Sequence, residues 1–227
     1  MELVTSAKSS EIRKIIENST DISVYSDRHY TNSWRRTSLV DKKYVFKEFD
    51  YKDKVRNYIW NVEADIIDYL HKVKEYKLPL PDNIDLEIRK SKKRVKAFYV
   101  KSFLDGKINK KYEDGHITDL ANTLFYLHQH DVLVLDVGSE NFVEIDGKLC
   151  PFDFGMGKIL KYNSLSFKKS RGEEFFRLSH VIDEAKFNAF IKEYSRLSGV
   201  SIFELMLFYK LHDFKQGFRS FRKRLFK

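Results

Sequence analysis

Residues 130–158 read HDVLVLDVGSENFVEIDGKLCPFDFGMGK, and this stretch decides the fold. Its apolar residues form short runs typical of strands, one leading into Asp136, one following Asn141 and one leading into Asp153. Asp146 and Gly147 separate the last two runs and favour a tight hairpin turn. Because a hairpin brings its two ends to one edge, we expect Asp136, Asn141 and Asp153 to lie close together.

Phosphoryl transfer uses two carboxylates and an amide in this kind of arrangement. One carboxylate orients or deprotonates the attacking hydroxyl, while the amide and the second carboxylate hold Mg²⁺. The order D-x4-N, followed one hairpin later by D-F-G, resembles the catalytic and metal-binding segments of the protein-kinase-like superfamily. The resemblance implies that Asp136 is the catalytic residue and that Asn141 and Asp153 are the metal ligands. The alternative is a buried hairpin with two capping aspartates and a turn asparagine.

The composition indicates a globular protein with an anionic partner. The chain has 227 residues, 42% of them hydrophobic, which suffices for one large domain or two small lobes with a core. No apolar run reaches the roughly 18 residues of a membrane span, and the N-terminus lacks the apolar core of a signal peptide. The single cysteine, Cys150, fits a reducing compartment, so we expect a cytoplasmic protein. The net charge of +9 favours nucleic acid, an anionic membrane surface or a phosphorylated substrate.

The N-terminal part of the chain predicts a small antiparallel sheet followed by a helix. Strand-like runs cover residues 21–25, 34–40 and 44–49, and Glu63 lies on or beside the apolar face of the following helix. Lys47 faces inward from an apolar strand and therefore needs an anionic partner. Lys47 and Glu63 resemble the kinase pair that holds the α- and β-phosphates, so we predict a catalytic role for both. The alternative for Lys47 is a solvated lysine on an edge strand.

Residues 26–33 are predicted to form the loop that lies over the nucleotide phosphates in a kinase-like fold. This loop contains no glycine. Arg28 is the side chain that we expect to contact the phosphates in place of a closely approaching glycine backbone. The alternative is an ordinary polar hairpin loop.

A second strand pair, over residues 84–88 and 95–103, ends where the composition changes from strand-rich to helix-rich. The kinase resemblance places the hinge here, with the backbone of Val100, Lys101, Ser102 and Phe103 contacting adenine. We therefore predict an α+β, two-lobed protein-kinase-like fold. Residues 1–103 form a small antiparallel-sheet lobe that binds nucleotide, and residues 104–227 form a reduced, mainly helical lobe.

The second lobe is predicted to support the hairpin with helices. A helix covers residues 117–128, and we expect His128 at its end to pack against or hydrogen-bond the hairpin backbone rather than act as an acid or base. A further helix, beginning with Arg171, Glu173 and Arg177, is expected to support the catalytic loop.

The last part of the chain predicts helices over residues 183–195 and 201–211 and a basic amphipathic tail over residues 214–227. Phe214, Phe218, Phe221 and Leu225 recur at helical spacing, and six lysines and arginines but no acid fill much of the rest. Such a helix suits an anionic membrane surface. The alternative is a last helix that packs on its own lobe through its aromatic face.

Several stretches are similar to the lipopolysaccharide core heptose kinases of Gram-negative bacteria, the WaaY/RfaY group. They are Tyr44-Val45-Phe46-Lys47, Glu63-Ala64, Phe103-Leu104-Asp105-Gly106, Leu127-His128-Gln129-His130, and Asp136 with Asn141. The resemblance implies ATP- and Mg²⁺-dependent phosphorylation of an inner-core heptose at the cytoplasmic face of the inner membrane. Residues 137–140 and the full Asp-Phe-Gly sequence depart from that group, and both departures concern the identity of the acceptor sugar.

Other acceptors and a non-enzymatic function are the alternatives. Kdo, an aminoglycoside or a protein could receive the phosphate, although the basic balance disfavours cationic acceptors. Val134 and Leu135 stand where protein kinases carry the first two residues of H-R-D, which disfavours a protein acceptor. A pseudokinase scaffold at the membrane is favoured by the missing glycine loop. Nucleic acid is not expected, because the basic residues are dispersed and no reader motif is present.

Overall fold

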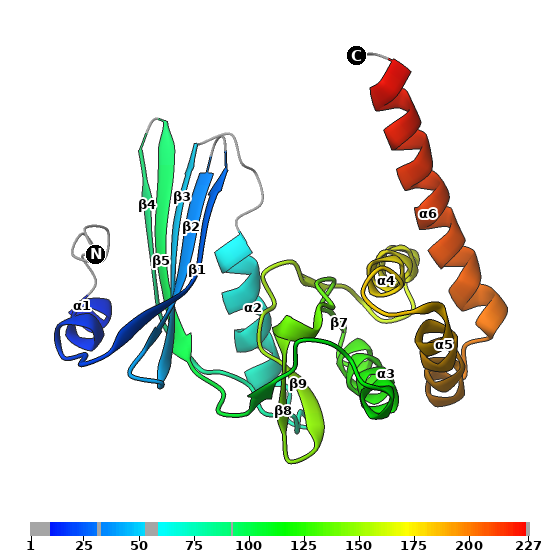
Figure 1. The fold of residues 1–227 in the computed structure, drawn as a ribbon, viewed down its shortest axis with the longest axis horizontal. Helices are drawn as coiled ribbons and strands as arrows, with labels where there is room; N and C mark the ends of the chain where they lie inside the picture. Colours follow the sequence, from blue (N-terminus) through cyan, green and yellow to red (C-terminus); the bar gives the residue numbers. More distant parts are fainter. Residues whose placement is uncertain (1–9, 31–32, 53–58, 92, 226–227) are drawn as a thin grey trace. The chain divides into compact units, whose positions relative to one another are not determined.

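The computed structural model describes residues 10–30, 33–52, 59–91 and 93–225. The chain divides into two compact units. The first unit comprises Met1–Lys72 and Pro79–Asp105, and the second unit comprises Val73–Leu78 and Gly106–Lys227. Residues 73–78, which the sequence analysis places in the first lobe, therefore group with the second unit. The helices, labelled in Figure 1, are α1 (Ser10–Glu17), α2 (Ile59–Lys72), α3 (Asp114–Gln129), α4 (Leu165–Leu178), α5 (Glu184–Ser198) and α6 (Ile202–Leu225).

The first unit is built on a five-stranded antiparallel sheet in the order β1-β2-β3-β5-β4. Its strands are β1 (Ile22–Tyr30), β2 (Ser33–Val40), β3 (Tyr44–Lys52), β4 (Asn83–Lys90) and β5 (Arg94–Ser102). The predicted antiparallel sheet is confirmed. The loop predicted over residues 26–33 is wrong in extent, because Tyr30 pairs with Ser33 and most of this segment lies in strands.

Cross-strand polar contacts explain why β1 and β2 continue beyond the predicted ends. The Asp27 carboxylate accepts hydrogen bonds from the Trp34 indole (2.8 Å) and from Arg36 Nη2 (2.9 Å) on the neighbouring strand. Pairs of opposite charge across an antiparallel ladder stabilise the pairing even where both side chains meet solvent.

The two faces of this sheet carry separate apolar clusters, because side chains alternate along a strand. Phe46 of β3 belongs to a buried cluster with Ile12 of α1. Phe49, three residues later, belongs to a cluster on the other face with Ala64 of α2. Lys47 shares the α2 face with Phe49, which directs its side chain toward that helix.

The second unit contains the predicted hairpin. Its strands are β6 (Lys107–Ile108), β7 (Val132–Leu133), β8 (Phe142–Ile145), β9 (Lys148–Pro151) and β10 (Lys158–Ile159), with β8 between β6 and β9 and with β7 paired to β10. Asp146 and Gly147 form the turn between β8 and β9 with φ of 50° and 73°. Two successive positive φ values define the tight turn that this dipeptide predicts.

The C-terminal helix α6 is one continuous helix of 24 residues, about 36 Å long. The sequence predicts two separate segments here, over residues 201–211 and 214–227. They merge because the chain between them contains no proline and Gly217 alone does not break a helix. Ser201 accepts a hydrogen bond from the Glu204 N–H (3.2 Å), as expected of an N-cap. No helix among the residues that the structure describes is long and apolar enough to cross a bilayer.

Candidate active site

One end of the hairpin brings together the predicted catalytic residue and the predicted metal ligands. The β8–β9 ladder ends between Asn141 and Phe152, whose N–H donates to the Asn141 carbonyl (3.1 Å). The Asn141 side-chain Nδ2 donates to the backbone carbonyl of Asp136 (3.2 Å). Asp153 follows Phe152 directly, and its Oδ1 accepts from the Gly155 N–H (3.0 Å). The structure therefore places Asp136, Asn141 and Asp153 around the same hairpin end.

This hairpin end concentrates negative charge. Burial raises the pKa of the Asp136 carboxyl, and the charges of Asp153 and Glu140 raise this pKa further. Arg177 and the Asn141 amide act in the opposite direction. A cation bound beside Asp136 and Asp153 would relieve this repulsion.

The donor groups of Asn141 and Asp153 fit a hard cation. An amide oxygen and a carboxylate are the ligands that Mg²⁺ prefers, and Mg²⁺ commonly takes one or two protein carboxylates together with phosphate oxygens and waters. Within the described ranges, no group of three or more histidine, cysteine, aspartate or glutamate side chains could hold a metal by itself. The residues present therefore fit a Mg²⁺ ion that shares its coordination with a nucleotide.

Glu174 of α4 fixes the backbone that leads into Asp136. Its Oε1 accepts hydrogen bonds from the N–H groups of Val134 (2.8 Å) and Leu135 (2.9 Å). Leu135 has a φ of 62°, a left-handed conformation that a leucine rarely adopts without support. Because the Glu174 carboxylate is fully buried, these two hydrogen bonds hold the strained residue in a water-free setting.

The second oxygen of Glu174 anchors this contact to the core. His128 Nε2 lies 2.6 Å from Glu174 Oε2, and His128 Nδ1 lies 2.6 Å from the Tyr194 hydroxyl. His128 therefore supports the hairpin backbone through Glu174, whereas the sequence predicts a direct contact of His128 with that backbone. The sequence predicts that a helix beginning with Arg171, Glu173 and Arg177 supports the loop, and Glu174 of that helix is not among the predicted residues. The signal in the sequence that could have identified Glu174 is its position as a carboxylate among the apolar residues of this helix.

In the first unit, Lys47 and Glu63 form the predicted pair. Lys47 Nζ lies 2.6 Å from Glu63 Oε2, and the Glu63 side chain is fully buried. Lys101 Nζ lies 2.6 Å from the other oxygen, Glu63 Oε1, and its side chain is only 1% exposed. One carboxylate thus contacts two ammonium groups. From the sequence we expect Lys101 to act through its backbone, and this second contact is not predicted.

The predicted hinge residues lie at the end of β5. Val100 and Lys101 are paired within the sheet on both sides. The Ser102 N–H donates to the Asp82 carbonyl (2.9 Å) and the Phe103 N–H donates to the Lys43 carbonyl (2.7 Å). A nucleotide base at Val100, Lys101, Ser102 or Phe103 would therefore have to use backbone atoms other than these two N–H groups.

Arg28 lies in β1, exposed and opposite Arg35 of β2, and not in the loop where the sequence analysis placed it. The connection between β1 and β2 is reduced to residues 31–32, which lie outside the described residues. A contact of Arg28 with phosphate stays a prediction.

Comparison with known proteins identifies the fold. No protein-family model matches the chain, and no curated protein matches it. An amicoumacin kinase in complex with AMP-PNP, Ca²⁺ and Ami is similar over 92% of this chain and 85% of its own, with a TM-score of 0.57 and 11% identity.

Two aminoglycoside phosphotransferases are similar to the same extent. APH(2″)-IIia, solved with GDP and kanamycin, matches 95% of this chain and 93% of its own, with a TM-score of 0.55 and 10% identity. A thermostable mutant of APH(4)-Ia, solved with AMP-PNP and hygromycin B, matches 96% and 94%, with a TM-score of 0.55 and 10% identity. The chain therefore has the protein-kinase-like fold that its sequence predicts.

Proposed function

We propose that the protein is an ATP-dependent kinase that phosphorylates a hydroxyl group of a small acceptor. The observation that carries this proposal is the meeting of Asp136, Asn141 and Asp153 at one hairpin end. The structural neighbours support the same reaction class, because they are phosphotransferases of the same fold solved with AMP-PNP or GDP. The alternative of a merely structural hairpin leaves the crowding of carboxylates around Asp136 without a purpose.

Each residue would contribute through its own chemistry. The Asp136 carboxylate would orient the acceptor hydroxyl and accept its proton late in the transfer. Burial raises the pKa of Asp136, which suits a group that accepts a proton, whereas a bound Mg²⁺ would offset the part of the shift that the charge of Asp153 causes. Asn141 and Asp153 would hold Mg²⁺, which when bound neutralises charge on the triphosphate. Lys47, oriented by Glu63, would contact phosphate oxygens.

We propose an inner-core heptose of lipopolysaccharide as the acceptor. This choice rests on the sequence stretches similar to the core heptose kinases, which include Lys47, Glu63, Asp136 and Asn141. The net charge of +9 also complements an acceptor rich in phosphate and carboxylate groups better than a cationic aminoglycoside. The enzyme would meet this acceptor at the cytoplasmic face of the inner membrane.

The acceptor is tested by incubating the protein with purified core oligosaccharide, ATP and Mg²⁺ and measuring the mass of the product. We expect one added phosphate, and tandem mass spectrometry should place it on heptose. Core forms without heptose, free Kdo and kanamycin are run in parallel. Transfer only to one of these other acceptors would support kinase activity but contradict heptose as the acceptor. Transfer to none of the acceptors would contradict the proposed class of acceptor.

The role of Asp136 is tested by the substitution Asp136→Asn, which keeps the size of the side chain and removes the base. We expect kcat to fall by about 10²–10⁴-fold while ATP binding is retained, because general base catalysis contributes that much. Asp146→Asn is the matched control, since this exposed residue lies in the turn of the same hairpin at a positive φ that asparagine accepts. Turnover of Asp136→Asn close to that of the control would remove Asp136 from the mechanism.

A pseudokinase scaffold is the second candidate, favoured by the short β1–β2 connection without glycine. Titration with ATP and Mg²⁺ separates the two candidates, because a ligand that binds only the folded state raises the melting temperature. A kinase should show this increase. An unchanged melting temperature at millimolar nucleotide would favour the scaffold.

A further inference from the structure

The first half of α6 has a well-defined packing side. Leu205 is buried, and the rings of Tyr209 and His212 contact Phe176 of α4. The two helices approach closely at Gly172 of α4, where a Cβ atom would lie 2.6 Å from the carbonyl carbon of Phe208. This approach fixes the rotation of α6 about its axis and therefore determines which residues face away from α4 and α5.

The opposite side of α6 carries an exposed apolar stripe. On a helix with 3.6 residues per turn its five members fall within an arc of about 80°. They are Phe203, Leu207, Leu211, Phe214 and Phe218, with 79%, 43%, 54%, 76% and 59% of their surface exposed. Single exposed apolar residues are ordinary, but five in one row form a contiguous patch of the kind that marks an interaction site.

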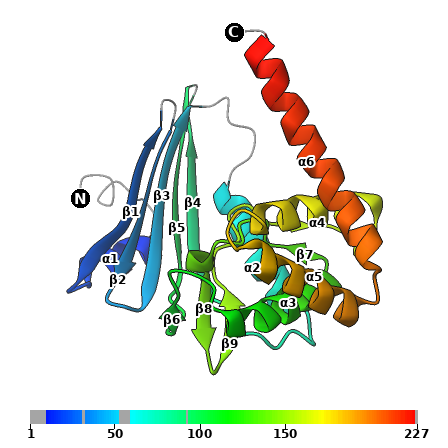
Figure 2. The same cartoon turned by 45° about the vertical axis from the view of Figure 1, so that its right-hand side comes forward.

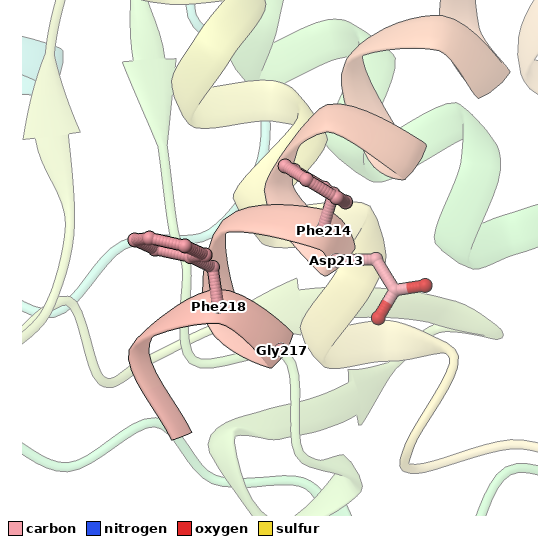
Figure 3. A pocket seen from close by; sticks show the side chains of 4 residues that line it. All are labelled: Asp213, Phe214, Gly217 and Phe218. Atoms are coloured by element: carbon pink, nitrogen blue, oxygen red, sulfur yellow. The ribbon is translucent and has the colours of Figure 1, made fainter. Parts of the chain in front are cut away.

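The stripe continues where α6 extends beyond α4 and α5, which both ribbon views show (Figures 1 and 2). Phe214 and Phe218 are one turn apart and lie with Asp213 and Gly217 around a shallow pocket. Figure 3 shows both rings on one side of the helix and the Asp213 carboxylate on the other. The small Gly217 leaves both rings open to an approaching apolar phase.

The charge around the stripe is positive. Exposed Lys210 and Lys215 lie at its two borders on the helical wheel, and Arg219 is also exposed. The sequence continues with Arg222, Lys223, Arg224 and Lys227, and it contains no acid after Asp213. An apolar row bordered by lysines matches a surface that is apolar below and anionic above, which is the boundary between acyl chains and headgroups of an anionic bilayer.

We propose that α6 is a membrane-docking helix that lies in the plane of an anionic bilayer surface, with this stripe inserted among the lipids. Charged residues on the remaining faces prevent the helix from spanning the bilayer, so it lies on the surface. This inference does not depend on the identity of the acceptor, and vesicle binding tests it without any measurement of activity.

The test is flotation of the full-length protein with vesicles of phosphatidylcholine, with and without phosphatidylglycerol. We expect co-flotation with the anionic vesicles, weaker binding to pure phosphatidylcholine, and loss of binding as salt rises, because salt screens attraction to the surface. Failure to float with vesicles rich in phosphatidylglycerol at low salt would overturn the proposal.

Two pairs of variants assign the binding to the stripe and to its charge. Phe214→Ser with Phe218→Ser, and Lys215→Glu with Arg219→Glu, should each weaken the partition coefficient by at least about tenfold. The matched controls are Val24→Ser with Tyr25→Ser, exposed apolar residues of β1, and Lys14→Glu with Lys192→Glu, exposed helical lysines. These controls should bind like the wild type.

Two further outcomes would contradict the proposal that α6 docks on a membrane. Equal loss of vesicle binding in the control variants would show that binding depends on the general charge or hydrophobicity of the protein and not on α6. Sedimentation of the wild type as a dimer that Phe214→Ser with Phe218→Ser dissociates, without vesicle binding, would show that a second copy of the chain covers the stripe.

Discussion

Glu174 serves two groups at once, and the effect that we expect it to have on the proposed reaction follows from that. One oxygen accepts from the backbone of Val134 and Leu135, and the other lies against His128. At the residue scale, this makes Glu174 a positioning residue, because it acts on Asp136 only through the backbone. The conformation of Leu135 depends on it.

We predict that Glu174→Gln lowers the free energy of unfolding by about 1–3 kcal/mol, because buried charge-assisted hydrogen bonds are weakened. It should also lower kcat with little change in the affinity for ATP. The control is Glu173→Gln, since Glu173 is the adjacent residue but pairs with Arg177 and Lys158 in a partly exposed setting. Denaturant unfolding and steady-state kinetics measure both effects, and equal behaviour of the two variants would contradict the assignment.

Glu48 is a buried carboxyl whose surroundings favour its neutral form. It is fully buried in β3, and within the described part of the chain neither carboxylate oxygen has a hydrogen-bond partner. Burial raises the pKa of Glu48 from 4.5 to about 7, although Arg36 acts to lower it. The folded state thus holds this proton more tightly than the unfolded state does. The contribution of Glu48 is most favourable below pH 4.5 and becomes less favourable as the pH rises toward 7.

We predict that Glu48→Gln removes this dependence, because glutamine imitates the protonated carboxyl at every pH. The free energy of unfolding of Glu48→Gln minus that of the wild type should grow by about 2–3 kcal/mol between pH 4.5 and pH 8. Denaturant unfolding at a series of pH values measures it, with Glu17→Gln on the exposed side of α1 as the control. Parallel curves for wild type and Glu48→Gln would show that the carboxyl titrates normally.

At the scale of elements, the contact between α4 and α6 depends on the absence of a side chain at Gly172. An added methyl group would overlap the backbone carbonyl of Phe208. A backbone cannot turn aside as a flexible side chain can, so the two helices would have to separate. The Gly172 position therefore determines how closely α6 is held against α4.

We predict that Gly172→Ala destabilises the protein by about 1–3 kcal/mol, despite the better helix propensity of alanine. Gly217→Ala in α6 is the control, because a Cβ atom there would meet no atom within 4 Å. It should stabilise the protein by up to about 1 kcal/mol. Thermal unfolding compares the two, and a neutral Gly172→Ala would show that the helices are not held this closely.

At the scale of the whole molecule, the sequence predicts the features that depend on neighbours in the chain. The alternation in β3, the turn at Asp146 and Gly147 and the order of Asp136, Asn141 and Asp153 are local signals. They suffice for the antiparallel sheet and for the hairpin, and the resemblance of this residue order to kinase segments implies the protein-kinase-like fold. An inward lysine on a strand needs an anionic partner, and the resemblance to the kinase lysine–glutamate pair identifies Glu63 as that partner of Lys47, which the structure confirms.

The features that sequence reasoning missed depend on distant residues. Lys101 and Glu63 are 38 residues apart, and Glu174 and Leu135 are 39 apart. Neither contact has a periodicity that reveals it. The extension of β1 and β2 depends on cross-strand contacts of Asp27 with Trp34 and Arg36. These contacts cannot be recognised in the sequence, where the segment is polar and is therefore predicted to be a loop.

The left-handed backbone at Leu135 has a consequence for the order in which the protein matures. Ribosomes release the chain from its N-terminus, so the hairpin emerges before the helix that carries Glu174. Until that helix packs, no carboxylate is present to stabilise the unusual turn before Asp136. A nascent or truncated chain that ends after Gly155 would contain all three acidic and amide side chains of the hairpin and still lack their alignment. Competence for chemistry would thus arrive late in synthesis, with α4.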